Sequence, residues 1–168
     1  MTIWTPRIFA IGMAALAALA APAARAGTSV DYPGPASAGT IVVQTSARTV
    51  LLVVGDGKAI QYTAGVGRAG KQWFGTTRIV SKHIRPAWAP PRGMRGNGPD
   101  RVIPAGSPRN PMGAAALVLA DNELAIHGTN NPASIGHFVS WGCVRLQNAE
   151  ILDLYSRVKV GTPVIFVR

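Results

Sequence analysis

Short runs of β-branched residues, separated by turn-forming residues, limit most strongly what this chain can fold into. Residues 49–54 (TVLLVV) and 58–63 (KAIQYT) flank the triplet Gly55-Asp56-Gly57. An Asp-Gly pair between two such runs predicts a tight hairpin, because the turn residues need positive φ angles. Further strands are expected at 41–43, 76–84, 114–120, 123–127 and 164–167, with a turn at Asp121-Asn122. The fold class is therefore predicted to be mainly β.

One helix is expected after residue 147. Asn148 suits its N-cap, and the carboxylate of Glu150 suits the positive N-terminal end of the helix dipole. The apolar face of this helix is expected to include Ile151, Leu152, Tyr155 and Val158. Gly161-Thr162-Pro163 then ends the helical unit ahead of the last strand.

A Pro/Gly-rich segment, residues 86–113, interrupts the regular pattern. It contains seven prolines, five glycines and four arginines. Prolines at this density exclude a regular helix or a central strand. A long irregular insertion in a compact domain is usually functional or disordered. We interpret the segment as a loop or lid beside an active site, with a flexible surface excursion as the alternative.

The first 26 residues have the pattern of an export signal. Arg7 precedes an apolar run at 8–21, and Ala24-Arg25-Ala26 fits a small-x-small cleavage site. The run is shorter than the roughly 20 residues that span a bilayer. We therefore expect residues 1–26 to be cleaved, 27–39 to form a short flexible tail, and 40–168 to form one domain. No other run is long enough to span a membrane, so the exported chain is expected to be soluble.

The charge balance indicates an anionic partner. Formal net charge is +10, and removal of Arg7 and Arg25 with the signal leaves about +8. A basic surface attracts anions. Export makes nucleic acid an unsuitable partner, whereas wall polymer or anionic lipid head groups fit; a merely basic surface with no partner explains the charge equally well.

Cys143 is the single cysteine of the chain, so it forms no intrachain disulfide. In an oxidising compartment such a thiol is either buried and inert or kept for its reactivity. A catalytic thiol must attack as the thiolate, which a nearby imidazole or cation favours. His127 lies sixteen positions upstream, and turn formers between the two let the chain fold back. Arg145 would share a face with Cys143 in an extended strand, where it stabilises the thiolate or holds a substrate carboxylate.

Gly142 precedes the thiol, and a residue without a side chain lets the backbone approach a substrate closely. The N–H groups around Cys143 would then form an oxyanion hole. A zinc site made of His127, His137 and Cys143 is an alternative, although no closely spaced ligand pair supports it. His83 and His137 are otherwise expected to be structural or surface residues, and Trp73 and Trp88 to serve in packing or to line a groove.

Three blocks of residues resemble the YkuD-type L,D-transpeptidase domain. They are Ile126-His127-Gly128-Thr129, residues 132–136 (PASIG) and residues 140–145 (SWGCVR), with similar segments at 65–67 and 160–164. The resemblance covers most of the chain after the signal and implies a β-sandwich with one helix packed after the cysteine loop. Trp141 stands where many members have a second histidine, and residues 74–77 (FGTT) lack the Thr-Pro pair often found there.

The resemblance also implies roles. Cys143 would be the acyl-accepting nucleophile and His127 the general base and later acid, with the Gly128 carbonyl orienting the imidazole. Arg145 would help to form the substrate pocket, and Ser140 and Gly142 would shape the loop. Trp141 would pack or line the substrate groove. No cofactor or metal is implied.

The implied substrate is the peptidoglycan stem peptide, and the implied location is the periplasm or cell wall. The acyl acceptor would be a second stem or a wall-anchored lipoprotein, and water would make the enzyme a carboxypeptidase or amidase. A carbapenem would act as a covalent inhibitor. Two other classes remain open at this point, namely a non-catalytic wall-binding module and a zinc-dependent wall hydrolase. Sensitivity to a chelator would indicate the hydrolase, and sensitivity to thiol alkylation the cysteine enzyme.

Overall fold

The computed structural model describes residue 1 and residues 27–90, 102–120 and 123–168. Most of the predicted signal, the middle of the Pro/Gly-rich segment (91–101) and the predicted turn Asp121-Asn122 lie outside the described residues. Within the described ranges, no helix has both the length and the apolar character to cross a bilayer.

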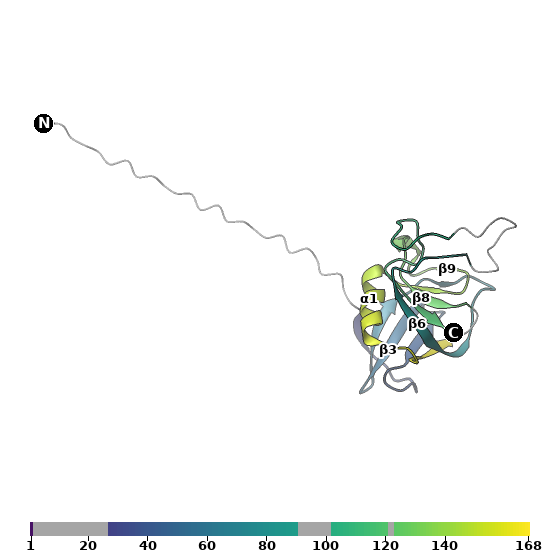
Figure 1. Cartoon of the computed structure of the whole chain (residues 1–168). Helices are drawn as coiled ribbons and strands as arrows, with labels where there is room; N and C mark the ends of the chain where they lie inside the picture. Colours follow the sequence, from purple (N-terminus) through teal and green to yellow (C-terminus); the bar gives the residue numbers. More distant parts are fainter. Residues whose placement is uncertain (2–26, 91–101, 121–122) are drawn as a thin grey trace.

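Strands dominate the described part of the chain, and nine of them form one sheet in the order β1-β4-β3-β2-β11-β6-β7-β8-β10 (Figure 1). In chain order these strands are Thr28–Asp31 (β1), Ile41–Gln44 (β2), Thr49–Gly55 (β3), Lys58–Thr63 (β4), Gly75–Ile84 (β6), Ala115–Leu119 (β7), Ala125–His127 (β8), Val144–Arg145 (β10) and Pro163–Val167 (β11). Two further strands, Val66–Gly67 (β5) and Phe138–Ser140 (β9), form a parallel pair. The mainly β prediction is confirmed.

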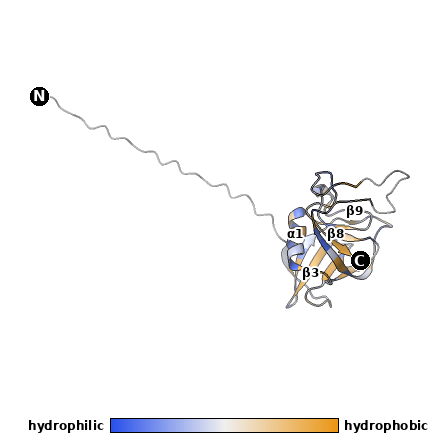
Figure 2. Cartoon of the chain, viewed as in Figure 1, coloured by the Kyte–Doolittle hydropathy of each residue, from blue (hydrophilic) through white to orange (hydrophobic). Residues whose placement is uncertain are grey.

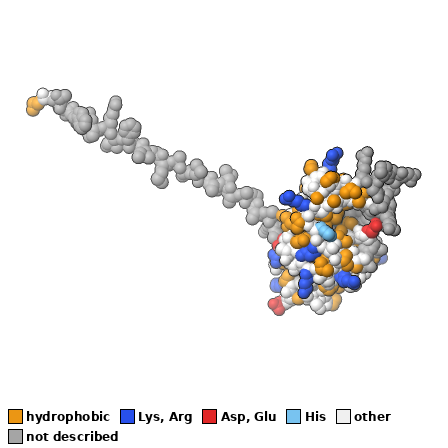
Figure 3. All heavy atoms as spheres, viewed as in Figure 1, with side chains coloured by type: hydrophobic (Ala, Val, Ile, Leu, Met, Phe, Trp, Pro, Cys, Tyr) orange, Lys and Arg blue, Asp and Glu red, His pale blue; other side chains and the backbone are white. Residues whose placement is uncertain are grey.

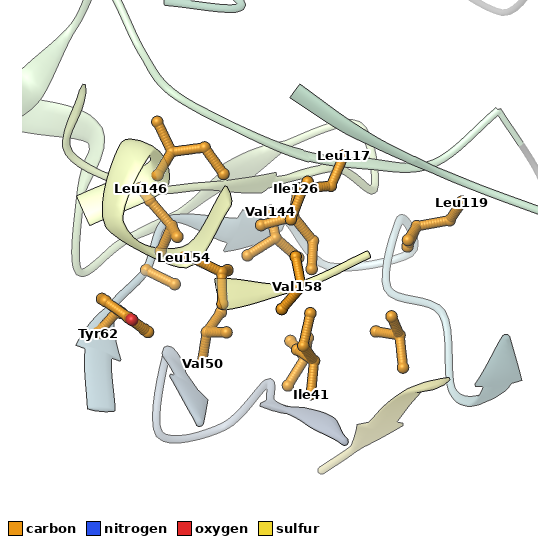
Figure 4. Packing of buried hydrophobic residues seen from close by; sticks show 14 of the residues in the cluster. Ile41, Val50, Tyr62, Leu117, Leu119, Ile126, Val144, Leu146, Leu154 and Val158 are labelled. Atoms are coloured by element: carbon orange, nitrogen blue, oxygen red, sulfur yellow. The ribbon is translucent and has the colours of Figure 1, made fainter. Parts of the chain in front are cut away.

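Strand β6 joins two halves of the large sheet. Its first residues pair with β11, and the residues from Ile79 onward pair with β7, with a register shift between Ile79 and Ser81. Such an irregularity bends a strand. Both halves contribute to one buried apolar cluster. Figure 4 shows its side chains between strands and the α-helix at Asn148–Arg157, and Figure 2 shows that several of these strands are hydrophobic. This cluster includes Ile41, Val50 and Tyr62 from one half and Leu117, Ile126 and Val144 from the other.

The predicted hairpin is confirmed between β3 and β4. Asp56 and Gly57 have φ angles of 52° and 66°, the left-handed region that a two-residue hairpin turn requires. Gly55 also has a positive φ, 105°, and the register shifts between Val53 and Gly55. The Asp-Gly signal predicts the turn, but it does not predict this bulge beside it.

The expected flexible tail is wrong for residues 28–31. They form the edge strand β1, antiparallel to β4, with Thr28 opposite Gln61 and Asp31 opposite Lys58. The Lys58 ammonium lies 2.5 Å from the Asp31 carboxylate, and both side chains are exposed. The free edge of β4 offers backbone donors and acceptors that a short polar segment can use without an apolar pattern of its own.

Helix α1, Asn148–Arg157, packs on the sheet, but its start and its apolar face differ from the prediction. The N-cap is Gln147, whose N–H donates to the Glu150 carboxylate at 3.2 Å, and Asn148 uses its side chain elsewhere. Ile151 and Leu154 are buried, whereas Leu152 is exposed, because one residue along a helix turns the side chain by about 100°. Val158 is buried just past the helix end, and Tyr155 is partly buried.

Candidate active site

The register of β8 and β10 brings the two sequence blocks of the site together. These strands are parallel, with Val144 opposite Ile126 and Arg145 opposite His127, and the Leu146 N–H donates to the His127 carbonyl at 2.8 Å. Register partners in neighbouring strands present their side chains on the same face of a sheet. Arg145 and His127 therefore face the same side, and Cys143 lies directly before β10.

His127 is buried, and its ring is held by the following residue. Nδ1 lies 2.7 Å from the Gly128 carbonyl oxygen, which can only accept, so Nδ1 carries the proton of the neutral ring. Burial lowers the pKa of His127 to about 4, and the Arg145 charge adds to this, while the Gly128 and Pro111 carbonyls partly offset it. The imidazole is thus neutral at neutral pH, with Nε2 as its basic nitrogen.

Cys143 is half-buried and opens into a cavity of about 380 Å³. Trp88, Met112 and Leu124 are among the residues that line this cavity. Burial raises the pKa of the Cys143 thiol, and the Ala125 backbone and the Arg145 charge only partly oppose this. Desolvation thus outweighs the nearby cation and favours the neutral thiol over the thiolate.

The loop before the thiol is pinned by one hydroxyl. Ser140 Oγ donates to the Cys143 carbonyl at 2.5 Å and accepts the Gly142 N–H at 3.1 Å. Gly142 has a φ of 132°, which strains any residue with a side chain, and a Cβ there would also displace Leu124 Cδ2, 2.9 Å away. The Gly142 N–H already donates to Ser140 Oγ, so an oxyanion would have to use another N–H of this loop, such as that of Cys143.

The backbone of Arg145 is held by two hydrogen bonds, and one nitrogen of its side chain has no partner among the described residues. Its N–H donates to the Gly65 carbonyl at 2.7 Å, and its carbonyl accepts the Gly65 N–H at 2.9 Å, so β10 is held on both sides. A Cβ at Gly65 would lie 2.5 Å from the Ser134 carbonyl oxygen. The buried Nε of Arg145 has no hydrogen-bond partner among the described residues, and a buried donor of this kind favours a ligand that accepts.

Trp141 lies next to the thiol in sequence but does not line its cavity among the described residues. Its ring, 40% exposed, carries the Arg68 guanidinium 3.8 Å from the ring centroid and the Lys71 ammonium at 4.8 Å. A guanidinium stacked on a ring keeps its N–H edges free for other partners. Trp141 thus orients two exposed cations beside the cysteine loop.

The other two histidines lie outside this arrangement. His83 Nε2 is 3.0 Å from Ser81 Oγ on the exposed part of β6, and the His137 carbonyl accepts the Val66 N–H. In the part of the chain that the structure describes, no three His, Cys, Asp or Glu side chains gather as metal ligands.

Two residues, Met112 and Asn148, are not predicted from the sequence as site residues. Trp88, for which packing and lining a groove are the two expectations, lines the Cys143 cavity together with Met112. The Pro/Gly-rich segment is tied at its base, where Trp88 and Ile103 exchange backbone hydrogen bonds of 2.9 and 2.7 Å. Asn148 bonds the backbone just after His127. The aromatic residue in the Pro-rich segment is a usable signal for Trp88, whereas nothing in the sequence distinguishes Asn148 from an ordinary cap.

Comparisons with known proteins show the family of this chain. The model of the L,D-transpeptidase catalytic domain family matches residues 38–166. The probable L,D-transpeptidase YbiS of Escherichia coli K12 is 37% identical over 145 residues, which are 80% of this chain and 46% of that protein. The chain thus spans about half the length of this curated relative.

Solved structures share the fold. L,D-transpeptidase 3 of Mycobacterium tuberculosis, in complex with a faropenem-derived adduct, superimposes with a TM-score of 0.62 at 20% identity, over 77% of this chain and 60% of that one. The L,D-transpeptidase LdtMt1 in complex with imipenem gives a TM-score of 0.60 at 18% identity, over 76% and 58% of the two chains.

Proposed function

The chain belongs to the L,D-transpeptidase catalytic domain family, and from this we propose that it is an exported cysteine transpeptidase acting on peptidoglycan stem peptides. The observation that carries the proposal is the β8–β10 register, which sets Arg145 opposite His127 and places Cys143 at the mouth of a cavity. The proposal that the protein is exported rests on the signal pattern of residues 1–26. It is also consistent with the proposed substrate, because peptidoglycan lies outside the cytoplasm. The expected location is the periplasm or cell wall.

Acylation is the first half of the proposed reaction. His127 Nε2 takes the thiol proton of Cys143 as the sulfur attacks the carbonyl carbon of the third residue of a tetrapeptide stem. The tetrahedral intermediate places its oxyanion at the Cys143 N–H. When it collapses, the bond to the terminal D-Ala breaks, and the imidazolium returns its proton to the leaving amine. The products are a thioester on Cys143 and free D-Ala.

Deacylation follows the same path in reverse. An amine from a second stem, or from a lipoprotein lysine, attacks the thioester while His127 accepts its proton. A new amide forms, and the sulfur leaves and recovers its proton from the imidazolium. If water is the acceptor, the enzyme is a carboxypeptidase on the same substrate.

The pKa shifts of Cys143 and His127 support a thiol and an imidazole that are both neutral before substrate binds. Burial favours both the neutral thiol and the neutral imidazole, so proton transfer occurs as substrate binds and not before. The Gly128 and Pro111 carbonyls favour the imidazolium once it forms. The unpartnered Nε of Arg145 supports a role for this guanidinium in holding a substrate carboxylate or a carbonyl oxygen.

Mass analysis of a single reaction tests the proposal. The full chain is incubated with a tetrapeptide stem, alone and with a second stem as amine donor. We expect release of D-Ala, a transient acyl adduct on Cys143 and a cross-linked product. The Cys143→Ala variant should retain the fold and form none of these, while the control His83→Ala should act as wild type. Wall binding without product, in wild type and Cys143→Ala alike, would contradict the enzyme and indicate a binding module.

A carbapenem serves as an independent probe of the thiol. The family likeness and the imipenem complex of LdtMt1 suggest this inhibitor class. We expect intact-mass spectrometry to show one adduct, located at Cys143 and absent from Cys143→Ala. An adduct on another residue, or none, would count against Cys143 as the nucleophile.

A further inference from the structure

The side-chain amide of Asn148, in the first turn of α1, is bound between two backbone segments beside the site. Its Oδ1 accepts the N–H of Ala114 at 3.0 Å and the N–H of Thr129 at 3.1 Å. Its Nδ2 donates to the Thr129 carbonyl at 3.0 Å. These three bonds use most of the hydrogen-bonding capacity of the amide. They join the helix to the end of the Pro/Gly-rich segment and to the residues that follow β8.

One peptide group connects this amide to the imidazole. The Thr129 N–H that Asn148 holds and the Gly128 carbonyl that holds His127 Nδ1 belong to the same peptide unit. A trans peptide is planar, and its N–H and C=O point in opposite directions. Fixing the N–H on one side therefore fixes the carbonyl on the other. Hydrogen bonds in series across one peptide also polarise each other, which strengthens both.

Two glycines provide the space for the amide. A Cβ at Gly128 would lie 2.3 Å from Asn148 Oδ1, and one at Gly113 would lie 2.2 Å from the same atom. Neither distance is compatible with a side chain while Asn148 occupies its position. The Gly128 N–H also donates to the Ala115 carbonyl at 3.0 Å, so the peptide is anchored from the sheet as well. The backbone around His127 is thus shaped to receive this one side chain.

We propose that Asn148 is a positioning residue for His127, which acts through the Gly128–Thr129 peptide to fix the tautomer and orientation of the imidazole. The proposal rests on His127 being the base in the proposed function. In this arrangement the Gly128 carbonyl takes the place of a triad carboxylate, and Asn148 keeps it aimed at Nδ1. Asn148 itself touches neither the thiol nor the substrate.

Removal of the Asn148 side-chain amide tests whether it positions His127 through the Gly128–Thr129 peptide. A displacement of about 1 Å at a reacting group can reduce a rate by about 10²-fold, so for Asn148→Ala we expect kcat to fall by about 10- to 100-fold with KM nearly unchanged. The pH midpoint for alkylation of Cys143 by iodoacetamide should rise, because a poorly held imidazole accepts the thiol proton less well. Asn148→Asp keeps an acceptor for both N–H groups and should recover most of the activity. Asn130→Ala, which removes a neighbouring amide with a single long contact of 3.4 Å, should behave as wild type.

The alkylation profile separates positioning from mere support of the fold. A lower melting temperature with an unchanged alkylation profile in Asn148→Ala would overturn the proposal, as would an unchanged kcat. If Asn148→Ala does not fold, ¹⁵N NMR of the wild-type imidazole provides the test. We expect the proton on Nδ1 at pH 7, and a proton on Nε2 instead would refute the positioning role of Asn148. The alkylation and NMR measurements need no stem peptide, so they stand even if wild type proves inactive in the transfer assay.

Discussion

His127 shows how burial shapes both chemistry and stability at a single residue. An imidazole with a depressed pKa is unprotonated at neutral pH and has a lone pair free to accept the thiol proton, as the proposed reaction needs. The folded protein, however, must exclude a proton that the unfolded chain binds below about pH 6.5. Stability therefore rises with pH wherever the unfolded state holds more protons.

We predict that the free energy of unfolding falls as the pH decreases from about 6.5 to about 4, the folded-state pKa of His127. The full loss amounts to about 3.5 kcal/mol, since one pKa unit corresponds to about 1.4 kcal/mol. Urea denaturation across this range provides the measurement. His127→Gln should flatten the slope, and His83→Gln, at an exposed position, should leave it unchanged. An equal slope in wild type and His127→Gln would show that other groups govern the pH dependence.

Residue types and spacing indicate which residues belong to the proposed site, but not their protonation states. The segments around His127 and Cys143 can be assigned to one site from the sequence, because the turn-forming residues between them let the chain fold back. Burial raises the pKa of the thiol, and the cavity beside it is lined by Trp88 and Met112, which are distant in sequence from Cys143. Only the folded chain determines how much water reaches the sulfur.

At the scale of elements, the C-terminal end of α1 is stabilised by a lysine side chain from strand β6. Lys82 of β6 donates to the Tyr155 carbonyl at 2.7 Å and to the Val158 carbonyl, and its ammonium lies 4.1 Å from the Tyr155 ring centroid. Carbonyls at a helix C-terminus lack intrahelical partners, and a cation there also meets the negative end of the helix dipole. Lys82 thus ties helix to sheet.

We expect Lys82→Met, which keeps the aliphatic stem, to lower the free energy of unfolding by about 1–2 kcal/mol, as loss of a favourable, partly buried helix-end charge does. Chemical denaturation is the measurement. Lys58→Met is the matched control, because its ion pair with Asp31 is exposed and should contribute less than about 1 kcal/mol. Equal effects in the two variants would argue against the capping role.

The elements that the sequence predicts are those with their own apolar pattern, such as β3, β4 and β6. The missed strands are β1, β5, β9 and β10, which are two to four residues long and exist because a neighbouring backbone is available for pairing. The predicted N-cap fails for a similar reason. Asn148 has suitable chemistry for a cap, but tertiary contacts with Ala114 and Thr129 claim its amide first.

Over the whole molecule, positive charge exceeds negative charge, and Figure 3 shows Lys and Arg spread over one face with few acidic side chains. Arg68 and Lys71 differ from the rest because Trp141 holds both beside the cysteine loop. Under the proposed function, these cations are positioned to attract free carboxylates of the stem peptide.

We predict that the double variant Arg68→Gln/Lys71→Gln raises KM for stems with free carboxylates about 3- to 10-fold, consistent with loss of about 1 kcal/mol of exposed charge attraction. KM for amidated stems and kcat for both should change little. Steady-state kinetics at low and high salt make the comparison, with Lys58→Gln/Lys159→Gln as a control of equal charge change. Equal losses on free and amidated stems would rule out recognition of the carboxylate.

Strand β11 lies between β2 and β6, and it is the only element of the described sheet that pairs with both. Residues 163–167 are translated after the other described strands, yet they pair between β2 and β6 in the middle of the sheet. A nascent polypeptide therefore cannot unite its two half-sheets while this segment is still inside the ribosome or a translocation channel. The residues that line the Cys143 cavity all precede this segment, so one half of the sheet can surround the thiol before the other half docks on it.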